Sequence, residues 1–255
     1  MRIIAARTAK IVNAAWKRQI TLQGLPSVGN PFFVAKLPFV WYNTAMNGYD
    51  FDKTILRGNS VQRLFYYCMV RFPYLILYMV ADIFIALLYA VRILNKHRFL
   101  TALEGFLLFV PNRQKVIERF WDKNLKHIRS WYLCLRRDDD VVISASPQFE
   151  VEVAAERLGI KCIATEGSVE PLKFGKVHCY GAEKVVAYKR AFGDTPLLSY
   201  YSDSWSDEPM FAFAQKGYLV KGDNVFLVYE NGKKLKKSDW KQVIKNGNFT
   251  DEAEQ

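Results

Sequence analysis

Three features of the 255-residue sequence predict an α/β fold built on a doubly wound, mostly parallel sheet. After residue 140, short apolar runs alternate with helical patterns, as in strand–helix–strand units. Acidic or hydroxyl residues end three of these strands, and open parallel sheets bind their ligands at that edge. A long apolar segment interrupts the pattern after the first strand, so we expect an inserted, all-helical cap.

The charge balance indicates an acidic partner for what is one large domain, or one domain with an insertion. Basic residues exceed acidic ones by 36 − 25 = 11, which favours phosphorylated substrates, anionic lipid surfaces or nucleic acid. Nucleic acid is disfavoured because the sequence shows no helix-turn-helix, zinc-finger or aromatic-basic RNA-binding signature. The four cysteines form no CxxC pair and are typical of a reduced, cytoplasmic chain. The three histidines lack metal-ligand spacing, which argues against zinc.

Residues 1–45 contain six basic and no acidic residues. The first eighteen could form a basic amphipathic helix that anchors the chain at a membrane surface. The alternative is a simple N-terminal extension, or a mis-assigned start, because the first strand begins near Met46. The segment does not resemble a secretory signal, since no compact apolar run ends in a small-residue cleavage site.

The first predicted strand ends at Asp50-Phe51-Asp52-Lys53-Thr54. In a strand, Asp50 and Asp52 share one face, so both carboxylates can meet one phosphate and one metal ion. One can attack phosphorus while the other handles the proton of the leaving group. The alternative is an ordinary polar turn. Asn59 and Ser60 then offer a helix cap, and we predict a helix from Val61 to about Arg71.

Residues 72–94 are the most apolar stretch and meet the length of a membrane span. Asp82 would then lie near the bilayer centre, at a cost of roughly 3 kcal/mol. A single crossing would also separate Asp50 from every residue beyond 140. We therefore expect a helical cap that lies on or dips into one leaflet; a soluble apolar cap and a two-helix hairpin are the alternatives. Residues 111–137 read as further cap helices, and Asp138 to Asp140 as a turn back into the main domain.

Residues 141–147 predict a second strand that ends in Ser144 and Ser146. Ser146 before Pro147 reads as the cap of a helix that runs to Leu158, which leaves Ser144 free to bind a phosphate oxygen. A strand at 160–165 follows, and then a hairpin over 166–180 with turns at two glycines, Gly167 and Gly175.

A helix from Gly181 to about Phe192 carries Lys184 in its first turn, either facing a ligand or as a surface residue. The strand over 196–201 ends near Asp203 and Asp207, whose spacing suits a hard cation; helix capping is the alternative for Asp207. Short strands are predicted at 217–220 and 225–229. The polar tail from residue 231 is expected to be mobile, apart from a possible short helix near residue 240.

The order of these motifs, DxDxT, strand–Ser, Lys on a helix and strand–SDSxxD, resembles the haloacid-dehalogenase-like phosphatases with their Rossmann-like core. The closest resemblance is to the phosphoserine-phosphatase branch, and it covers about residues 47–222. The implied organisation is a basic extension (1–45), a phosphatase core (46–71 and 138–229), an apolar helical cap (72–137) and a polar tail (230–255).

The resemblance implies a phosphoric monoester hydrolase in which Asp50 is the nucleophile and forms an aspartyl-phosphate. Asp52 would protonate the leaving oxygen and later activate water. Ser144 and Lys184 would hold the phosphoryl oxygens, and Thr54 would help to position the first loop at the substrate.

The resemblance also implies Mg²⁺ as the cofactor. Its ligands would be Asp50, the main-chain carbonyl of Asp52, and Asp203, with Asp207 in support. Mg²⁺ and Lys184 together would offset the charge that keeps a carboxylate from attacking a phosphate dianion.

The substrate is implied less directly. Phosphoserine phosphatases carry an acidic residue where Asn59 stands here, which argues against phosphoserine. The apolar cap and the Tyr201-Ser202-Asp203-Ser204 segment resemble the phosphatidylglycerophosphatase C family, which implies a lipid phosphate, contact with a membrane through residues 72–94, and a place on the cytoplasmic side of the membrane or in the cytoplasm. The alternatives are a soluble phosphatase of a small metabolite and a catalytically silent membrane-associated protein.

Overall fold

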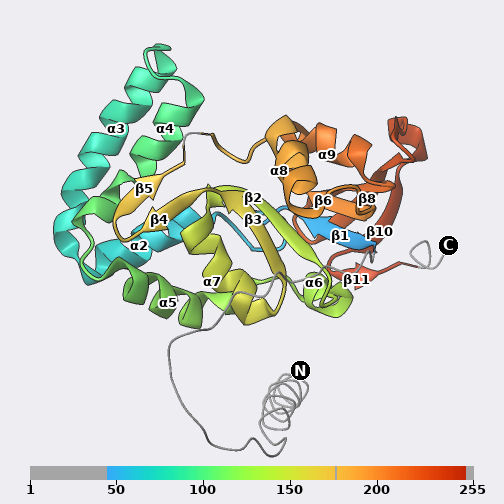
Figure 1. The fold of residues 1–255 in the computed structure, drawn as a ribbon, viewed down its shortest axis with the longest axis horizontal. Coiled ribbons are helices and arrows are strands. Elements are labelled where there is room, and N and C mark those ends of the chain that lie inside the picture. Colours follow the sequence, from blue (N-terminus) through green and yellow to red (C-terminus); the bar gives the residue numbers. More distant parts are fainter. Residues whose placement is uncertain (1–44, 176, 251–255) are drawn as a thin grey trace, which may run out of the picture. The chain divides into compact units, whose positions relative to one another are not determined.

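The computed structural model describes residues 45–175 and 177–250 (Figure 1). The predictions for the N-terminal extension concern residues 1–45 and so lie almost wholly outside the described part of the chain. The described residues form a mixed α/β structure, as predicted.

A nine-stranded sheet runs through the described residues in the order β11-β10-β8-β7-β6-β1-β2-β3, with β9 paired to β8. The five strands from β7 to β3 are parallel, and the strands from β8 onward are antiparallel. The predicted doubly wound, mostly parallel sheet is therefore confirmed. The strands are β1 (Met46–Tyr49), β2 (Val141–Pro147), β3 (Lys161–Thr165), β6 (Leu197–Ser202), β7 (Lys216–Lys221), β8 (Asn224–Glu230), β9 (Lys233–Lys234), β10 (Lys241–Lys245) and β11 (Asn248–Phe249).

The alternation of side chains along β2 builds two cores, one on each face of the sheet. Val142 belongs to a cluster formed with α2 (Ser60–Arg71), α5 (Arg113–Asn124), α6 (Ser130–Leu135) and α7 (Gln148–Leu158). Val141 and Ile143 point the other way and pack with α8 (Ala182–Phe192) and α9 (Glu208–Phe213). Since β2 is buried on both faces, it reads as an uninterrupted apolar run, as central parallel strands do.

The inserted segment supplies a helical hairpin of α3 (Ile76–Ala90) and α4 (Lys96–Leu103), flanked by short turns η1 (Pro73–Leu75) and η2 (Glu104–Phe109). The hairpin projects beyond the sheet at the upper left of Figure 1. The rings of Tyr89 and Phe99 stack at 4.3 Å and fasten its two helices together. Of the described residues, one helical segment, Pro73–Ala90, is long and apolar enough to cross a bilayer.

The last part of the predicted cap, unlike the projecting hairpin, packs against the central sheet. After the short turn η3 (Leu125–His127), helix α6 packs against the central strands, where the ring of Tyr132 meets that of Tyr49 at 4.8 Å and Trp131 lies 5.9 Å from Tyr201. These aromatic side chains complete the core that begins at β1. The chain has thus returned to the sheet by residue 130, earlier than the predicted boundary at 137.

The hairpin predicted over residues 166–180 is present as β4 (Gly167–Val169) and β5 (Leu172–Phe174), but its turn lies at Glu170-Pro171. The predicted turns at Gly167 and Gly175 are wrong. A Cβ at either position would lie 2.8 or 2.5 Å from a main-chain oxygen. These glycines therefore permit close approach of the backbone.

The predicted mobile tail is also wrong for residues 231–249, which form β9, the turn η5 (Lys237–Asp239), β10 and β11. Strand β10 pairs with β8 and buries Ile244, while Trp240 packs 5.9 Å from Trp205. The many lysines of this segment lie on exposed positions around these apolar anchors. They mask the short strand pattern in the sequence.

Candidate active site

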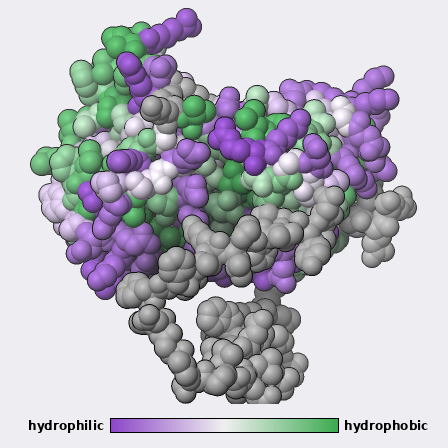
Figure 2. All heavy atoms as spheres, viewed as in Figure 1, coloured by the Kyte–Doolittle hydropathy of each residue, from purple (hydrophilic) through white to green (hydrophobic). Residues whose placement is uncertain are grey.

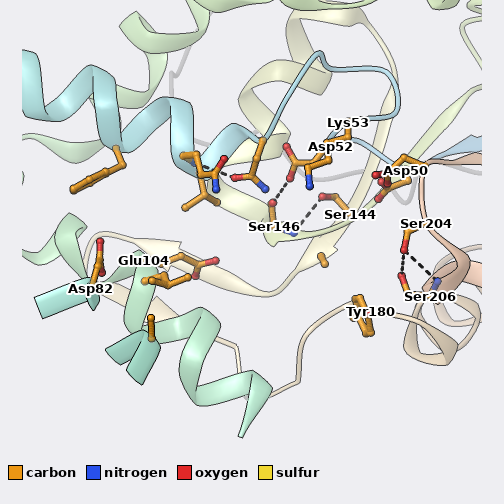
Figure 3. A pocket seen from close by; sticks show the side chains of 18 of the residues that line it. Asp50, Asp52, Lys53, Asp82, Glu104, Ser144, Ser146, Tyr180, Ser204 and Ser206 are labelled. Carbon is orange, nitrogen blue, oxygen red and sulfur yellow. Dashed lines mark hydrogen bonds between the residues drawn. The ribbon is translucent and has the colours of Figure 1, made fainter. Parts of the chain in front are cut away.

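Three adjacent parallel strands end at the same edge of the sheet and bring the predicted site residues together. Asp50 follows β1, Ser144 lies in β2 two residues beyond the last pair that β2 forms with β1, and Asp203 follows β6. They line one cavity of about 700 Å³, drawn in Figure 3. The other predicted residues on its wall are Asp52, Lys184 and Asp207.

Lys184 is the buried centre of the site, with 2 % of its surface exposed. Its Nζ lies 2.6 Å from Asp50 Oδ1, 2.6 Å from Asp207 Oδ2 and 3.1 Å from the hydroxyl of Tyr200. Burial lowers the pKa of Lys184, but Asp50, Tyr200 and Asp207 outweigh it and hold that pKa well above its usual value. Of the two roles considered for Lys184, the structure excludes the solvated surface residue.

Burial and a neighbouring cation have opposite effects on the pKa of the Asp50 carboxyl group. Burial raises its pKa to about 7, and Lys184 opposes this rise. Thr54 Oγ1 donates a 3.1 Å hydrogen bond to Asp50 Oδ2 and accepts one of 2.9 Å from the main-chain N–H of Asp203. Thr54 therefore ties the first loop to the end of β6. This contact sets Asp50 and the start of the Asp203 segment side by side.

Asp52 points toward the N-terminus of α2. Its carboxylate accepts hydrogen bonds from the main-chain N–H of Ser60 at 2.6 Å and from the Ser146 hydroxyl at 2.6 Å. The prediction that Ser146 caps the following helix is wrong: the N-cap is Pro147, without a side-chain bond. Ser144 Oγ accepts a 3.1 Å bond from the N–H of Ser146, so its hydroxyl hydrogen can point into the cavity.

Asp207 does not cap α9 through its side chain. It is 2 % exposed, and its Oδ2 accepts hydrogen bonds from Lys184, Tyr200 and, at 2.9 Å, Ser202. These donors satisfy the buried carboxylate within the protein. Asp207 is thereby suited to orienting Lys184.

Arg129 supports the first loop from behind, a contact that the sequence did not reveal. Its guanidinium donates to the carbonyls of Thr54 at 2.8 Å and Lys53 at 3.2 Å, and pairs with Asp223 at 2.6 Å. Three fixed donors on one side chain hold the loop that carries both motif aspartates.

The match to a family model decides what kind of protein this is. Residues 48–212, more than half of the chain, match the model of the haloacid dehalogenase-like hydrolases. The chain belongs to this family. The predicted family and the prediction of a hydrolytic enzyme are thus confirmed, and the match spans the whole site just described.

One of the similar solved structures shares the fold of this chain with a TM-score above 0.5. A protein of unknown function from Bordetella pertussis Tohama I is similar with a TM-score of 0.57 and 16% identity, over 68% of this chain and 89% of that one. A HAD family hydrolase from Salmonella enterica subsp. enterica serovar Typhi gives 0.49 and 13%, over 68% and 60%. A phosphoserine phosphohydrolase-like protein from Francisella tularensis subsp. tularensis SCHU S4 gives 0.45 and 15%, over 68% and 86%. No curated protein matches the chain.

Haloacid dehalogenase-like hydrolases generally use Mg²⁺, and the donors at this site suit it. Among the described residues, no three His, Cys, Asp or Glu side chains form a metal-binding group. The predicted set has Asp50 and Asp203 as side-chain ligands, the main-chain carbonyl of Asp52 as a third ligand, and Asp207 in support. In the structure, Asp207 Oδ2 accepts hydrogen bonds from Lys184, Tyr200 and Ser202 instead. The three predicted ligands all offer oxygen atoms, which Mg²⁺ prefers.

Two buried glutamates near Asp52 were not predicted as site residues from the sequence. Glu104, at the start of η2, lies on the cavity wall, and Glu150 of α7 lies buried nearby. Burial raises the pKa of Glu104 to about 8 and that of Glu150 well above its usual value, and in both cases the charge of Asp52 adds to the rise. No local pattern marks a buried carboxyl group, so only the tertiary structure reveals them.

Replacing Glu150 with glutamine is expected to raise the unfolding temperature, and by more at pH 8 than at pH 5. Since the folded-state pKa is raised, the unfolded chain loses this proton first as the pH rises. Stability then falls from near pH 4.5 toward the folded-state pKa, by up to about 1.4 kcal/mol per pH unit. Glutamine removes this slope, which thermal unfolding at pH 5, 6.5 and 8 measures.

The exposed Glu152, on the same helix, provides the control. Glu152→Gln should leave the pH dependence of unfolding unchanged. A lower unfolding temperature for Glu150→Gln at pH 8 would show instead that the native Glu150 is ionised and stabilising.

Proposed function

We propose that this hydrolase is a Mg²⁺-dependent phosphomonoesterase that acts on a lipid phosphate through an aspartyl-phosphate. The chemistry rests on the grouping of Asp50, Asp52, Ser144, Lys184 and Asp203 around one cavity. The lipid substrate rests on one further observation, the extension of that cavity to the apolar helix α3.

In the first step, a carboxylate oxygen of Asp50 attacks phosphorus and the bond from phosphorus to the ester oxygen breaks. Asp52 gives its proton to the departing oxygen; burial raises the pKa of Asp52, while Ser146 and Ser60 oppose that rise. In the second step, Asp52 takes a proton from water, which attacks the phosphorus and releases inorganic phosphate from Asp50.

Lys184 and Ser144 bind the phosphoryl oxygens in both steps. The fixed positive charge of Lys184 stabilises the charge that develops on those oxygens, and Ser144 donates a hydrogen bond from the strand end. Bound Mg²⁺, held by Asp50, Asp203 and the carbonyl of Asp52, would supply further positive charge at the phosphoryl group.

The apolar part of the cavity is built by one face of α3. Met79, Asp82, Ile83 and Ala86 line it at spacings of three and four residues, opposite Val61 and Phe65 of α2. Asp82 also lines this part of the cavity; its Oδ1 has no hydrogen-bond partner, and burial raises the pKa of its carboxyl group to about 6. An alkyl chain on the phosphate ester would find apolar walls here while the phosphate reaches Asp50.

A neighbouring face of α3 is apolar as well, with Val80, Phe84 and Leu87 between 57 and 67 % exposed. The hydrophobic surface at the upper left of Figure 2 covers this hairpin. A helix with one face on the substrate cavity and another exposed apolar face suits a position at one leaflet. We place the enzyme at a membrane surface, on its cytoplasmic side, without a crossing.

The lipid proposal is tested by blocking the apolar end of the cavity with Ala86→Trp. The ratio of kcat/KM for phosphatidylglycerophosphate micelles to that for an aryl phosphate should fall by about tenfold or more, because an overfilled cavity excludes the chain. Val186→Trp, at an exposed apolar position of α8 outside this cavity, should leave the ratio unchanged. An unchanged ratio in Ala86→Trp, with the protein folded, would show that the lipid does not enter beside α3.

Membrane contact has its own test. The double variant Phe84→Glu with Leu87→Glu should weaken binding to anionic phospholipid vesicles by about tenfold or more, since each apolar side chain contributes about 1.5–3 kcal/mol when buried. Vesicle flotation measures this. Val186→Glu, at an exposed apolar residue of α8, is the matched control. If the wild type, the double variant and Val186→Glu float equally with the vesicles, α3 is not the membrane contact.

A further inference from the structure

Glu104 is a buried carboxyl group on the cavity wall that the proposed reaction does not use. It is 5 % exposed, and its Oε2 is a buried oxygen without a hydrogen-bond partner. Figure 3 shows its carboxyl group directed into the cavity, across from the edge that carries Asp52 and Ser146. Buried polar atoms are almost always paired in native proteins, so an unpaired one that faces a cavity indicates a missing ligand.

The surroundings of Glu104 make the carboxyl group costly for folding alone. Leu103 precedes it, and the next turn buries Phe106 and Leu107. An apolar side chain at position 104 would suit these neighbours better, because it would leave no polar atom unsatisfied. A contact with a bound molecule explains why a carboxyl group stands here.

The electrostatic environment of Glu104 indicates what kind of group it meets. Burial, together with the charge of Asp52, raises the pKa of Glu104 to about 8. Near pH 7 the carboxyl group is mostly uncharged, with one O–H donor and free acceptor capacity. A hydroxyl group also has one O–H donor and acceptor lone pairs, so it can both donate a hydrogen bond to this carboxyl group and accept one from it.

The position of Glu104 indicates where that hydroxyl group lies on the substrate. Asp52, the proposed acid for the leaving oxygen, is close enough to influence Glu104, and both are on the wall of one cavity. In the view of Figure 3, Glu104 lies between Asp52 and Asp82, and the wall also includes the apolar Phe65 and Ile83. The hydroxyl group therefore belongs to the leaving alcohol, between the ester oxygen and any apolar chain.

We propose that Glu104 is a specificity-determining residue that hydrogen-bonds to a hydroxyl group of the leaving alcohol, close to the ester oxygen. This rests on the proposed phosphomonoesterase function and narrows its substrates to phosphate monoesters of hydroxylated, glycerol-like alcohols.

The test compares two substrate pairs that differ by this hydroxyl group. The lipid pair is 1-acyl-glycerol 3-phosphate and its 2-deoxy analogue, 1-acyl-propane-1,3-diol 3-phosphate, in mixed micelles; the soluble pair is propane-1,2-diol 1-phosphate and propyl phosphate. Wild-type kcat/KM should favour the hydroxylated member by about tenfold or more, the range of one well-placed hydrogen bond. Glu104→Leu should bring that ratio close to one, and Glu104→Gln, which keeps a donor and an acceptor, should retain most of it.

The two variants also separate specificity from a loss of structure. Because leucine removes an unpaired buried carboxyl group, Glu104→Leu should unfold at or above the wild-type temperature. A wild-type ratio near one in both pairs, or a ratio that survives in Glu104→Leu, would overturn the proposal for Glu104.

The lipid and soluble substrate pairs together distinguish failure of the proposal for Glu104 from failure of the proposed lipid phosphatase function. A Glu104-dependent ratio in the soluble pair, with no turnover of either lipid, would support the role of Glu104 and refute a lipid substrate. Turnover of both lipids at equal rates would refute the role of Glu104 and leave the lipid function standing. Turnover of neither pair would refute both.

Discussion

Asp50→Asn is expected to reduce phosphate release by a factor on the order of 10⁴ or more for every substrate, because loss of a covalent nucleophile removes the main reaction path. Asparagine preserves the shape of the side chain, and Lys184 keeps Asp207 as a partner at 2.6 Å. The fold should therefore survive. Steady-state release of inorganic phosphate measures the loss, and thermal unfolding verifies the structure.

Asp122→Asn is the control for this variant, because Asp122 is an exposed residue of α5 whose carboxylate forms an ion pair with Arg157 of α7 at 2.7 Å. Its activity should match the wild type. Residual activity of Asp50→Asn within about tenfold of the wild type would assign the nucleophile to another group.

Lys184→Met should reduce both the stability of the protein and its activity. It removes the cation shared by Asp50 and Asp207, and breaking a buried ion pair from one side costs about 3–5 kcal/mol. It also removes charge stabilisation at the phosphoryl group, for which we expect a fall in kcat on the order of 10²–10³. Chemical denaturation and steady-state kinetics measure the two effects separately.

Lys189→Met, at an exposed position of the same helix, should change neither quantity appreciably. If Lys184→Met lost stability and kept its full kcat, Lys184 would serve the fold alone. The double variant Lys184→Met with Asp207→Asn should recover part of the lost stability, since it leaves one fewer unpaired carboxylate in the core.

The strand-end residues could be predicted because their positions follow from simple rules. Parallel strands end at one edge, so residues as distant in sequence as Asp50, Ser144 and Asp203 must meet there. The helix termini followed equally local signals, such as Asn59 before α2 and Gly159 after α7.

Other features depend on contacts that no local pattern encodes. A serine before proline reads as a helix cap, and only the folded chain shows that Ser146 turns to Asp52. Lys184 looks like a surface lysine until the strands bring Asp50 and Asp207 to it. In the same way, Arg129 and Glu104 owe their positions to packing between segments far apart in the chain.

The most direct test of the account is Mg²⁺-dependent phosphate release from phosphatidylglycerophosphate and 1-acyl-glycerol 3-phosphate micelles, compared with phosphoserine and an aryl phosphate. Each substrate is measured with Mg²⁺ and with EDTA, and Asp50→Asn serves as the blank. The account predicts that a lipid has the highest kcat/KM, and that its turnover disappears with EDTA and in the variant. Turnover confined to the small phosphates, or unaffected by EDTA, would contradict it.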